Sequence, residues 1–186
     1  MFLGIDQSLR STGLAVVTEQ QEVIHVGAIT PKNLVGVPRL AFIRDEIERV
    51  IRREKIIHYA ALEGYSMESV NRSFDLGELG GLVRLVLHDA GIPFLVVPPT
   101  TLKLFVSSNG ASDKEAMCNA VFKKWKQKFD PEEENDECDA FGLAQVARAF
   151  HLNTGTTRAE LEVIKKLRDT SKKISLVSSG PRGLSV

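Results

Sequence analysis

Cysteine is scarce in this 186-residue sequence, which contains only Cys118 and Cys138. Two cysteines cannot build a disulfide framework, and neither has a partner at the C-x-x-C spacing that zinc sites use. Both fall in segments whose pattern predicts helices, so we expect reduced thiols in a reducing compartment. The sequence therefore argues against a disulfide-stapled domain and against a zinc site.

Long apolar runs are also missing. No stretch of about 18 or more residues is free of charge and proline, so we expect no transmembrane helix. The first residues lack a basic segment followed by an apolar run, so we expect no secretory signal. No internal repeat of roughly 20–50 residues is visible. The length, with 43% hydrophobic residues, suits one domain with a buried core.

Net charge is zero, which argues mildly against a generally basic nucleic-acid binder. The charge is uneven, however. Residues 155–186 hold seven basic and three acidic side chains, a net +4, so residues 1–154 carry −4. We expect a folded domain over residues 1–153 and a basic tail, partly helical or disordered, over residues 154–186. The surplus of acids in the first part is consistent with a cluster that binds a cation.

Hydrophobic patterning predicts an alternation of strands and helices. The predicted strands are residues 2–6, 12–18, 23–29, 58–62 and 93–97. The predicted helices are residues 38–55, 75–90, 100–106, 112–129, 136–150 and 159–169. Short turns favour antiparallel pairing of the first three strands, and Ser112 with Glu115 fits a capping box. This order predicts an α/β fold with one sheet flanked by helices.

Four acids stand at the ends of these elements. Asp6 ends the first strand, Glu63 follows the fourth, and Asp136 and Asp139 share a face of a late helix. If the first and fourth strands are neighbours, all four acids converge at one end of the sheet. Clustered carboxylates repel one another, whereas Mg²⁺ takes oxygen ligands and two such ions support phosphodiester cleavage. A metal site would explain the acids.

Each acid also has an ordinary structural interpretation. Asp6 can be a turn residue, Asp136 a helix N-cap and Asp139 a first-turn acid favoured by the helix dipole. Glu63 is harder to explain in this way, because it ends an apolar strand and precedes a glycine. Singly the four signals are weak, but together and in this order they favour a site.

Four segments carry a resemblance to a known family: GIDQSLRSTGLAVV, ALEGY, PPTTLKLFVSSNGASDKEAM and NDECDAFGLA. Together they resemble the RuvC-type Holliday junction resolvases of the ribonuclease H-like superfamily, most closely the small phage-type members. The resemblance covers residues 2–150 and implies a ribonuclease H-like fold, with a five-stranded mixed sheet flanked by helices. Gln7 and Ser8 depart from the family's usual GIDPG, and Ser66 replaces an aromatic residue that stacks on DNA bases.

The resemblance also implies roles for particular residues. It implies that the catalytic residues of this chain, which also bind the metal, are Asp6, Glu63, Asp136 and Asp139. The implied cofactor is Mg²⁺, and Mn²⁺ can substitute for it. The resemblance implies that Lys103 and Lys114 bind DNA, and we add Tyr65 and Arg72 from the loop after Glu63. The helix from residue 75 matches the helix through which the family dimerises, and we predict dimer contacts from Leu76, Leu79, Gly80 and Val83.

The implied function is a homodimeric endonuclease that resolves four-way DNA junctions by symmetric paired nicks and leaves 5′-phosphate ends. No membrane is involved, and the setting is the cytoplasm of a bacterial or phage-infected cell, with an organelle as an alternative. Other functions stay open: a nuclease for branched DNA, flaps or RNA–DNA hybrids, or an inactive junction-binding protein. An actin-like kinase or ATPase needs a second glycine-rich phosphate motif, which is not found here.

Overall fold

A five-stranded mixed sheet forms the centre of the computed structural model, which describes residues 1–64 and 73–178. The strand order is β3-β2-β1-β4-β5. Their bounds are β1 Phe2–Asp6, β2 Thr12–Val17, β3 Val23–Ile29, β4 Tyr59–Glu63 and β5 Phe94–Val97. The first three strands pair antiparallel, whereas β4 lies parallel to β1 and to β5. The predicted sheet and its antiparallel first half are thus confirmed.

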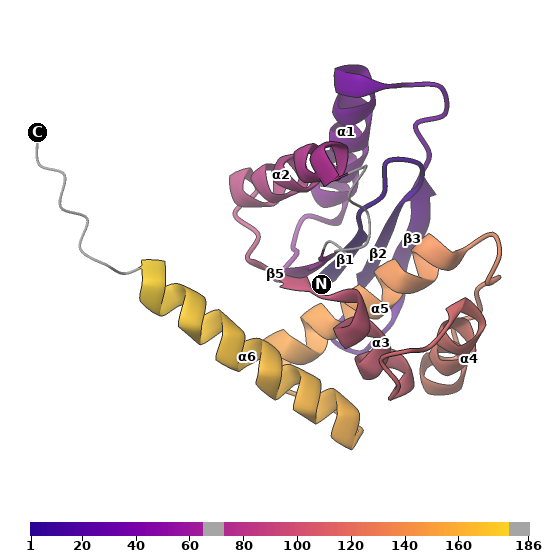
Figure 1. Cartoon of the computed structure of the whole chain (residues 1–186), viewed down its shortest axis with the longest axis vertical. Coiled ribbons are helices and arrows are strands. Elements are labelled where there is room, and N and C mark those ends of the chain that lie inside the picture. Colours follow the sequence, from indigo (N-terminus) through magenta and orange to yellow (C-terminus); the bar gives the residue numbers. More distant parts are fainter. Residues whose placement is uncertain (65–72, 179–186) are drawn as a thin grey trace, which may run out of the picture.

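Helices cover both faces of this sheet (Figure 1). They are α1 Gly36–Glu54, α2 Ser73–Asp89, α3 Pro99–Ser107, α4 Lys114–Trp125, α5 Asn135–Leu152 and α6 Arg158–Ser178. One core lies under α1 and α2, and the other lies among α3, α4, α5 and α6. Side chains alternate along a strand, so Phe2 joins the α5 core while Leu3 and Ile5 join the opposite one. Among the described helices, none is long and apolar enough to cross a membrane.

Two details of α4 differ from the prediction. The helix ends at Trp125, because Lys126 adopts a left-handed backbone with φ 61° and closes the last turn. Its N-cap is Asp113, whose side chain accepts a hydrogen bond from the amide of Ala116 at 2.8 Å. Ser112 is instead buried and shares a 2.7 Å hydrogen bond with the hydroxyl of Ser107. The helix therefore begins two residues later than predicted, and its cap is Asp113 rather than Ser112.

Helix α6 is longer than the predicted helix and is anchored by a buried acid. Glu160 is 4% exposed and accepts hydrogen bonds from Lys124 Nζ at 2.8 Å and from the amide of Thr156 at 2.7 Å. Burial alone would raise the pKa of Glu160, but these hydrogen bonds outweigh it and hold that pKa below its ordinary value. Val163 and Leu167 are buried in the α5 core. The first half of the basic segment thus packs onto the same core as residues 1–153.

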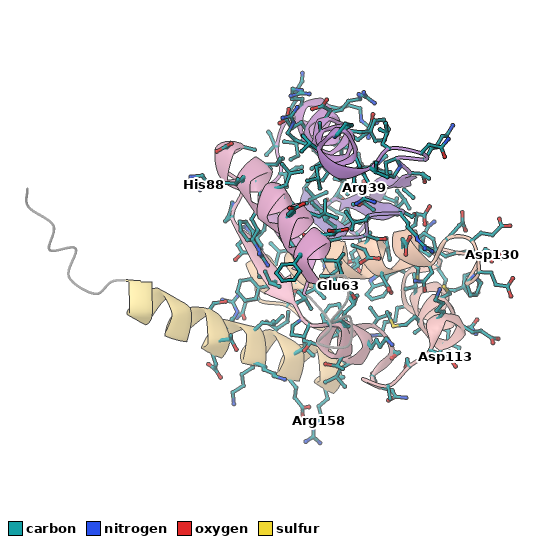
Figure 2. All side chains as sticks on the ribbon, turned by 45° about the horizontal axis from the view of Figure 1, so that its top comes forward. Arg39, Glu63, His88, Asp113, Asp130 and Arg158 are labelled. Carbon is teal, nitrogen blue, oxygen red and sulfur yellow. The ribbon has the colours of Figure 1, made fainter. Side chains whose placement is uncertain are left out.

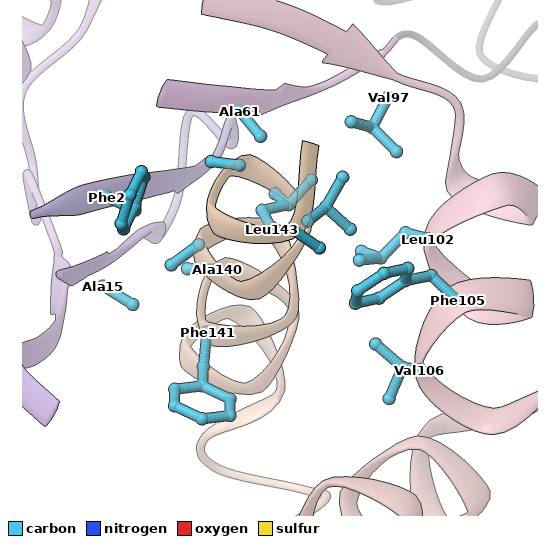
Figure 3. Packing of buried hydrophobic residues seen from close by; sticks show 14 of the residues in the cluster. Phe2, Ala15, Ala61, Val97, Leu102, Phe105, Val106, Ala140, Phe141 and Leu143 are labelled. Atoms are coloured by element: carbon cyan, nitrogen blue, oxygen red, sulfur yellow. The ribbon is translucent and has the colours of Figure 1, made fainter. Parts of the chain in front are cut away.

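Helix α5 lies directly on the backbone of β1 and β2 at two glycines. A Cβ atom on Gly4 would stand 1.9 Å from the carbonyl oxygen of Ala140, and one on Gly13 would stand 2.0 Å from that of Asp136. Figure 3 shows α5 lying between the strand residues Phe2 and Ala15 and the residues of α3. Only glycine permits this close approach. It brings the N-terminal end of α5 to the end of β1.

Candidate active site

Asp6 and Glu63 are the last residues of two neighbouring strands, β1 and β4. Their strands are parallel neighbours, and the last paired residues, Ile5 and Leu62, immediately precede the two acids. Asp6 is 6% exposed, and Glu63 is close enough for its charge to raise the pKa of Asp6. Glu63 lies near the middle of the molecule (Figure 2). The sequence argument required the first and fourth strands to be neighbours, and the sheet meets this condition.

The other two acids come from the start of α5. Asp6 pairs with Gly13 across β1 and β2, and the carbonyl of Asp136 lies against Gly13. Asp139 stands about one turn further along the same helix. The charges of Glu63, Asp139 and Asp136 all act on Asp6. The fold therefore gathers the four predicted acids into one electrostatic cluster, which we call the carboxylate cluster.

Protonation of the carboxylate cluster reflects its burial. Burial, and then the charges of Glu63 and Asp139, raise the pKa of Asp6 well above its ordinary value. Burial and the charge of Glu63 likewise raise the pKa of Asp139, to about 7. The pKa of Glu63 is raised by burial too, although its hydrogen bond with Asp6 and the charge of Lys103 oppose the change. Such shifts mark a place where negative charge lacks sufficient compensation.

A hard divalent cation fits this set of donors. All four side chains are carboxylates, and the buried Oδ1 atom of Asp139 has no hydrogen-bond partner in the described part of the chain. Within residues 1–64 and 73–178, no three acidic, histidine or cysteine side chains already surround a common point. Burial raises the pKa of both Asp6 and Glu63, which favours their protonated forms. Binding a cation would displace these protons and turn both groups into ligands.

Lys103 and Lys114 lie near the carboxylate cluster. Lys103 belongs to α3, and Lys114 is the first residue of α4. Burial raises the pKa of Asp139, and the charges of both lysines act against that rise. Each lysine is thus close enough to influence the acids. Their ammonium groups add positive charge beside the acids, where a phosphate would need it.

The remaining predicted site residues are either outside the described part of the chain or on α2. Tyr65 and Arg72 lie outside the described residues. The predicted dimer contacts of Leu79, Gly80 and Val83 need correction, because these three residues are buried within this chain. Elsewhere on α2, Phe74, Gly77 and Leu85 are exposed, whereas Leu76 and Gly81 are half-buried. Helical spacing did not show which side of α2 the sheet would cover.

Gln7 was noted in the sequence only as a departure from a motif. In the structure its Nε2 atom donates a hydrogen bond of 2.7 Å to the backbone carbonyl of Glu63. The signal was present, since a residue beside Asp6 differed from the family pattern. Its contact with β4 depended on strand order, which the motif does not contain.

The sheet order, with carboxylates at the ends of two adjacent strands and on a helix crossing them, defines a protein of the ribonuclease H-like fold. A family model described as "Crossover junction endodeoxyribonuclease RuvC" matches residues 2–146. The chain belongs to this RuvC family.

Individual relatives agree with this assignment. The crossover junction endodeoxyribonuclease RuvC of Chloroflexus aggregans is 31% identical over 123 residues, which make up 64% of this chain and 75% of that relative. The Thermus thermophilus RuvC structure has a TM-score of 0.68 at 21% identity, covering 83% of this chain and 97% of that one. T. thermophilus RuvC in complex with Holliday junction substrate has a TM-score of 0.65 at 20% identity, covering 76% and 88%. The structural matches support the fold.

Proposed function

We propose that this chain is an endonuclease that resolves four-way DNA junctions by symmetric paired nicks in a homodimer and leaves 5′-phosphate ends. The observation that carries the proposal is the buried carboxylate cluster at the ends of β1 and β4, in a chain of the RuvC family. A related protein, T. thermophilus RuvC, has been solved with a Holliday junction substrate. For a DNA enzyme of a bacterial or phage-infected cell, the place of action is the cytoplasm.

In this proposal Asp6, Glu63, Asp136 and Asp139 hold Mg²⁺, with Mn²⁺ able to take its place. When bound, such ions activate water toward phosphorus and stabilise the leaving oxygen. The chain contributes ionised oxygen ligands from two strands and one helix, which fix their relative positions. Lys103 and Lys114 bind the phosphate backbone beside the acids, giving affinity without reading base sequence.

A cleavage assay tests the substrate. The chain is incubated with a synthetic four-way junction, a matched linear duplex, a flap and an RNA–DNA hybrid, in Mg²⁺ or in EDTA. We expect paired nicks at symmetric positions of the junction alone, lost completely in EDTA. Cutting of flaps or hybrids but not junctions would keep the carboxylate chemistry and reject the junction as substrate. Tight junction binding without any cleavage in Mg²⁺ would reject the enzyme altogether.

Dimer formation is expected through the exposed stripe of α2. Phe74, Gly77, Gly81 and Leu85 follow one another at helical spacing, and Phe74 is 87% and Leu85 60% exposed. A Cβ atom on either glycine would meet nothing within 4 Å, so a second helix can approach closely. We expect Leu85→Glu to convert a micromolar dimer into a monomer, because it places a charge in an apolar interface.

Sedimentation equilibrium at micromolar concentration measures this change. Leu161→Glu is the matched control, since Leu161 is an exposed leucine, 53% accessible, on α6. The control should sediment as the unsubstituted dimer does. A wild-type chain that sediments as a monomer, or an α6 control that dissociates equally, would contradict the proposed interface.

A further inference from the structure

The side chain of Gln7 joins the two strands that carry Asp6 and Glu63. Its Nε2 atom lies 2.7 Å from the backbone oxygen of Glu63. A carbonyl oxygen can only accept, so this contact fixes which end of the amide points to β4. The other end, Oε1, is buried and has no hydrogen-bond partner among the residues that the structure describes.

The Gln7 hydrogen bond joins β1 and β4 just beyond their last paired residues. Registered pairing of β1 with β4 ends at Ile5 and Leu62. Beyond it the two carboxylates emerge together, and two ionised carboxylates in contact repel each other. The Gln7 amide ties the strands together one step further, at the backbone of Glu63 itself. Without this bond, β1 and β4 would hold the two repelling carboxylates together less firmly.

We propose that Gln7 is a positioning residue for the metal site: its Nε2 holds Glu63 beside Asp6, and its Oε1 accepts a hydrogen bond from the hydration shell of the bound cation. The inference rests on the proposed function, because it takes the carboxylate cluster to be a metal site. The unpartnered Oε1 supports it, since buried acceptors without any donor are rare. A hydrated cation would supply the donor that the described protein atoms lack.

The test replaces Gln7 with methionine, which keeps the length of the side chain but removes both hydrogen-bonding groups. Gln20→Met is the matched control, because Gln20 is an exposed residue of the turn between β2 and β3. Thermal unfolding of the full chain is followed over a range of Mn²⁺ concentrations. We expect the Mn²⁺ concentration for half of the stabilisation to rise about five- to tenfold in Gln7→Met, the loss of one to two hydrogen bonds. Gln20→Met should match the unsubstituted chain.

Two further measurements separate positioning from simple stability. The midpoint of unfolding in EDTA reports any general loss of packing, and junction affinity in EDTA reports DNA binding without metal. If Gln7→Met lowers the EDTA midpoint but leaves the Mn²⁺ dependence unchanged, its role is structural and the inference is overturned. An unchanged Mn²⁺ dependence with unchanged stability overturns it equally.

The thermal titration requires no DNA, so its outcome is independent of the substrate. A chain that binds Mn²⁺ but leaves junctions intact would disprove the junction activity and still decide the role of Gln7. A chain that gains no stability from millimolar Mn²⁺ would overturn both the metal site and the role of Gln7.

Discussion

Asp6→Asn is expected to reduce junction cleavage by about a thousandfold or more while leaving the chain folded. Asparagine has nearly the same shape as aspartate, but it offers the cation a neutral oxygen in place of a charged one. Asp6 lies on the central strand β1 and is almost fully buried, so the sheet fixes its place in the carboxylate cluster. The measurement is the single-turnover rate on a four-way junction in saturating Mg²⁺.

Junction binding separates catalysis from folding in this experiment. We expect Asp6→Asn to bind the junction at least as tightly as the wild type, because one negative charge near the phosphates is gone. Asp45→Asn is the control, since Asp45 is an exposed acid of α1 whose partner is the adjacent Arg44. It should cut at the wild-type rate. An Asp6→Asn variant with near-normal cleavage would contradict the assignment of the catalytic centre.

Asp6→Asn should also change how the stability of the chain in EDTA depends on pH. Burial and neighbouring acids raise the pKa of Asp6, and they raise that of Asp139 from 3.8 to about 7. The folded chain therefore binds more protons than the unfolded chain, and its stability falls as pH rises from about 4 towards 7. Asp6→Asn removes one of the interacting charges, so this fall should be smaller. Urea unfolding at several pH values in EDTA measures both slopes.

Prediction from sequence succeeded where local signals agreed with the tertiary fold. The strand ending in Asp6 and the strand that carries Glu63 are short apolar runs closed by polar residues. The first forms as predicted, and the second lies one residue later than predicted, so that Glu63 ends it. Their adjacency was only a condition in the sequence argument, because the pairing of strands far apart in the chain is set by the packing of whole layers. Once that pairing is known, the meeting of the two acids follows from the parallel register.

Prediction failed where the deciding contact was distant. The stripe of α2 was periodic, but both of its sides carry apolar residues and glycines, so periodicity did not identify the buried side. Leu79 and Val83 were found against the sheet, and Phe74 and Leu85 outside it. The length of α6 likewise depends on contacts, since Glu160 binds Lys124 across 36 residues of sequence.

The largest structural effect is expected from the glycines beneath α5. We expect Gly13→Ala to destabilise the chain by about 1–3 kcal/mol or more, because overpacking of a tight core has this range. The added methyl group would lie 2.0 Å from the carbonyl oxygen of Asp136, which is backbone and cannot rotate away. The start of α5 must therefore shift. Urea unfolding in EDTA gives the loss of stability.

Gly27→Ala provides the control, because Gly27 lies on β3 and its added Cβ atom would make only an ordinary 3.6 Å contact with the ring of His25. Gly4→Ala should resemble Gly13→Ala in stability, since its Cβ atom would meet the backbone of Ala140 at 1.9 Å. The two variants should differ in metal binding. Gly13 lies under Asp136, so its substitution displaces that acid directly and should weaken the response to Mn²⁺ among molecules that stay folded. Equal Mn²⁺ responses in the folded wild type and Gly13→Ala would show that the position of Asp136 is not what makes the carboxylate cluster bind metal.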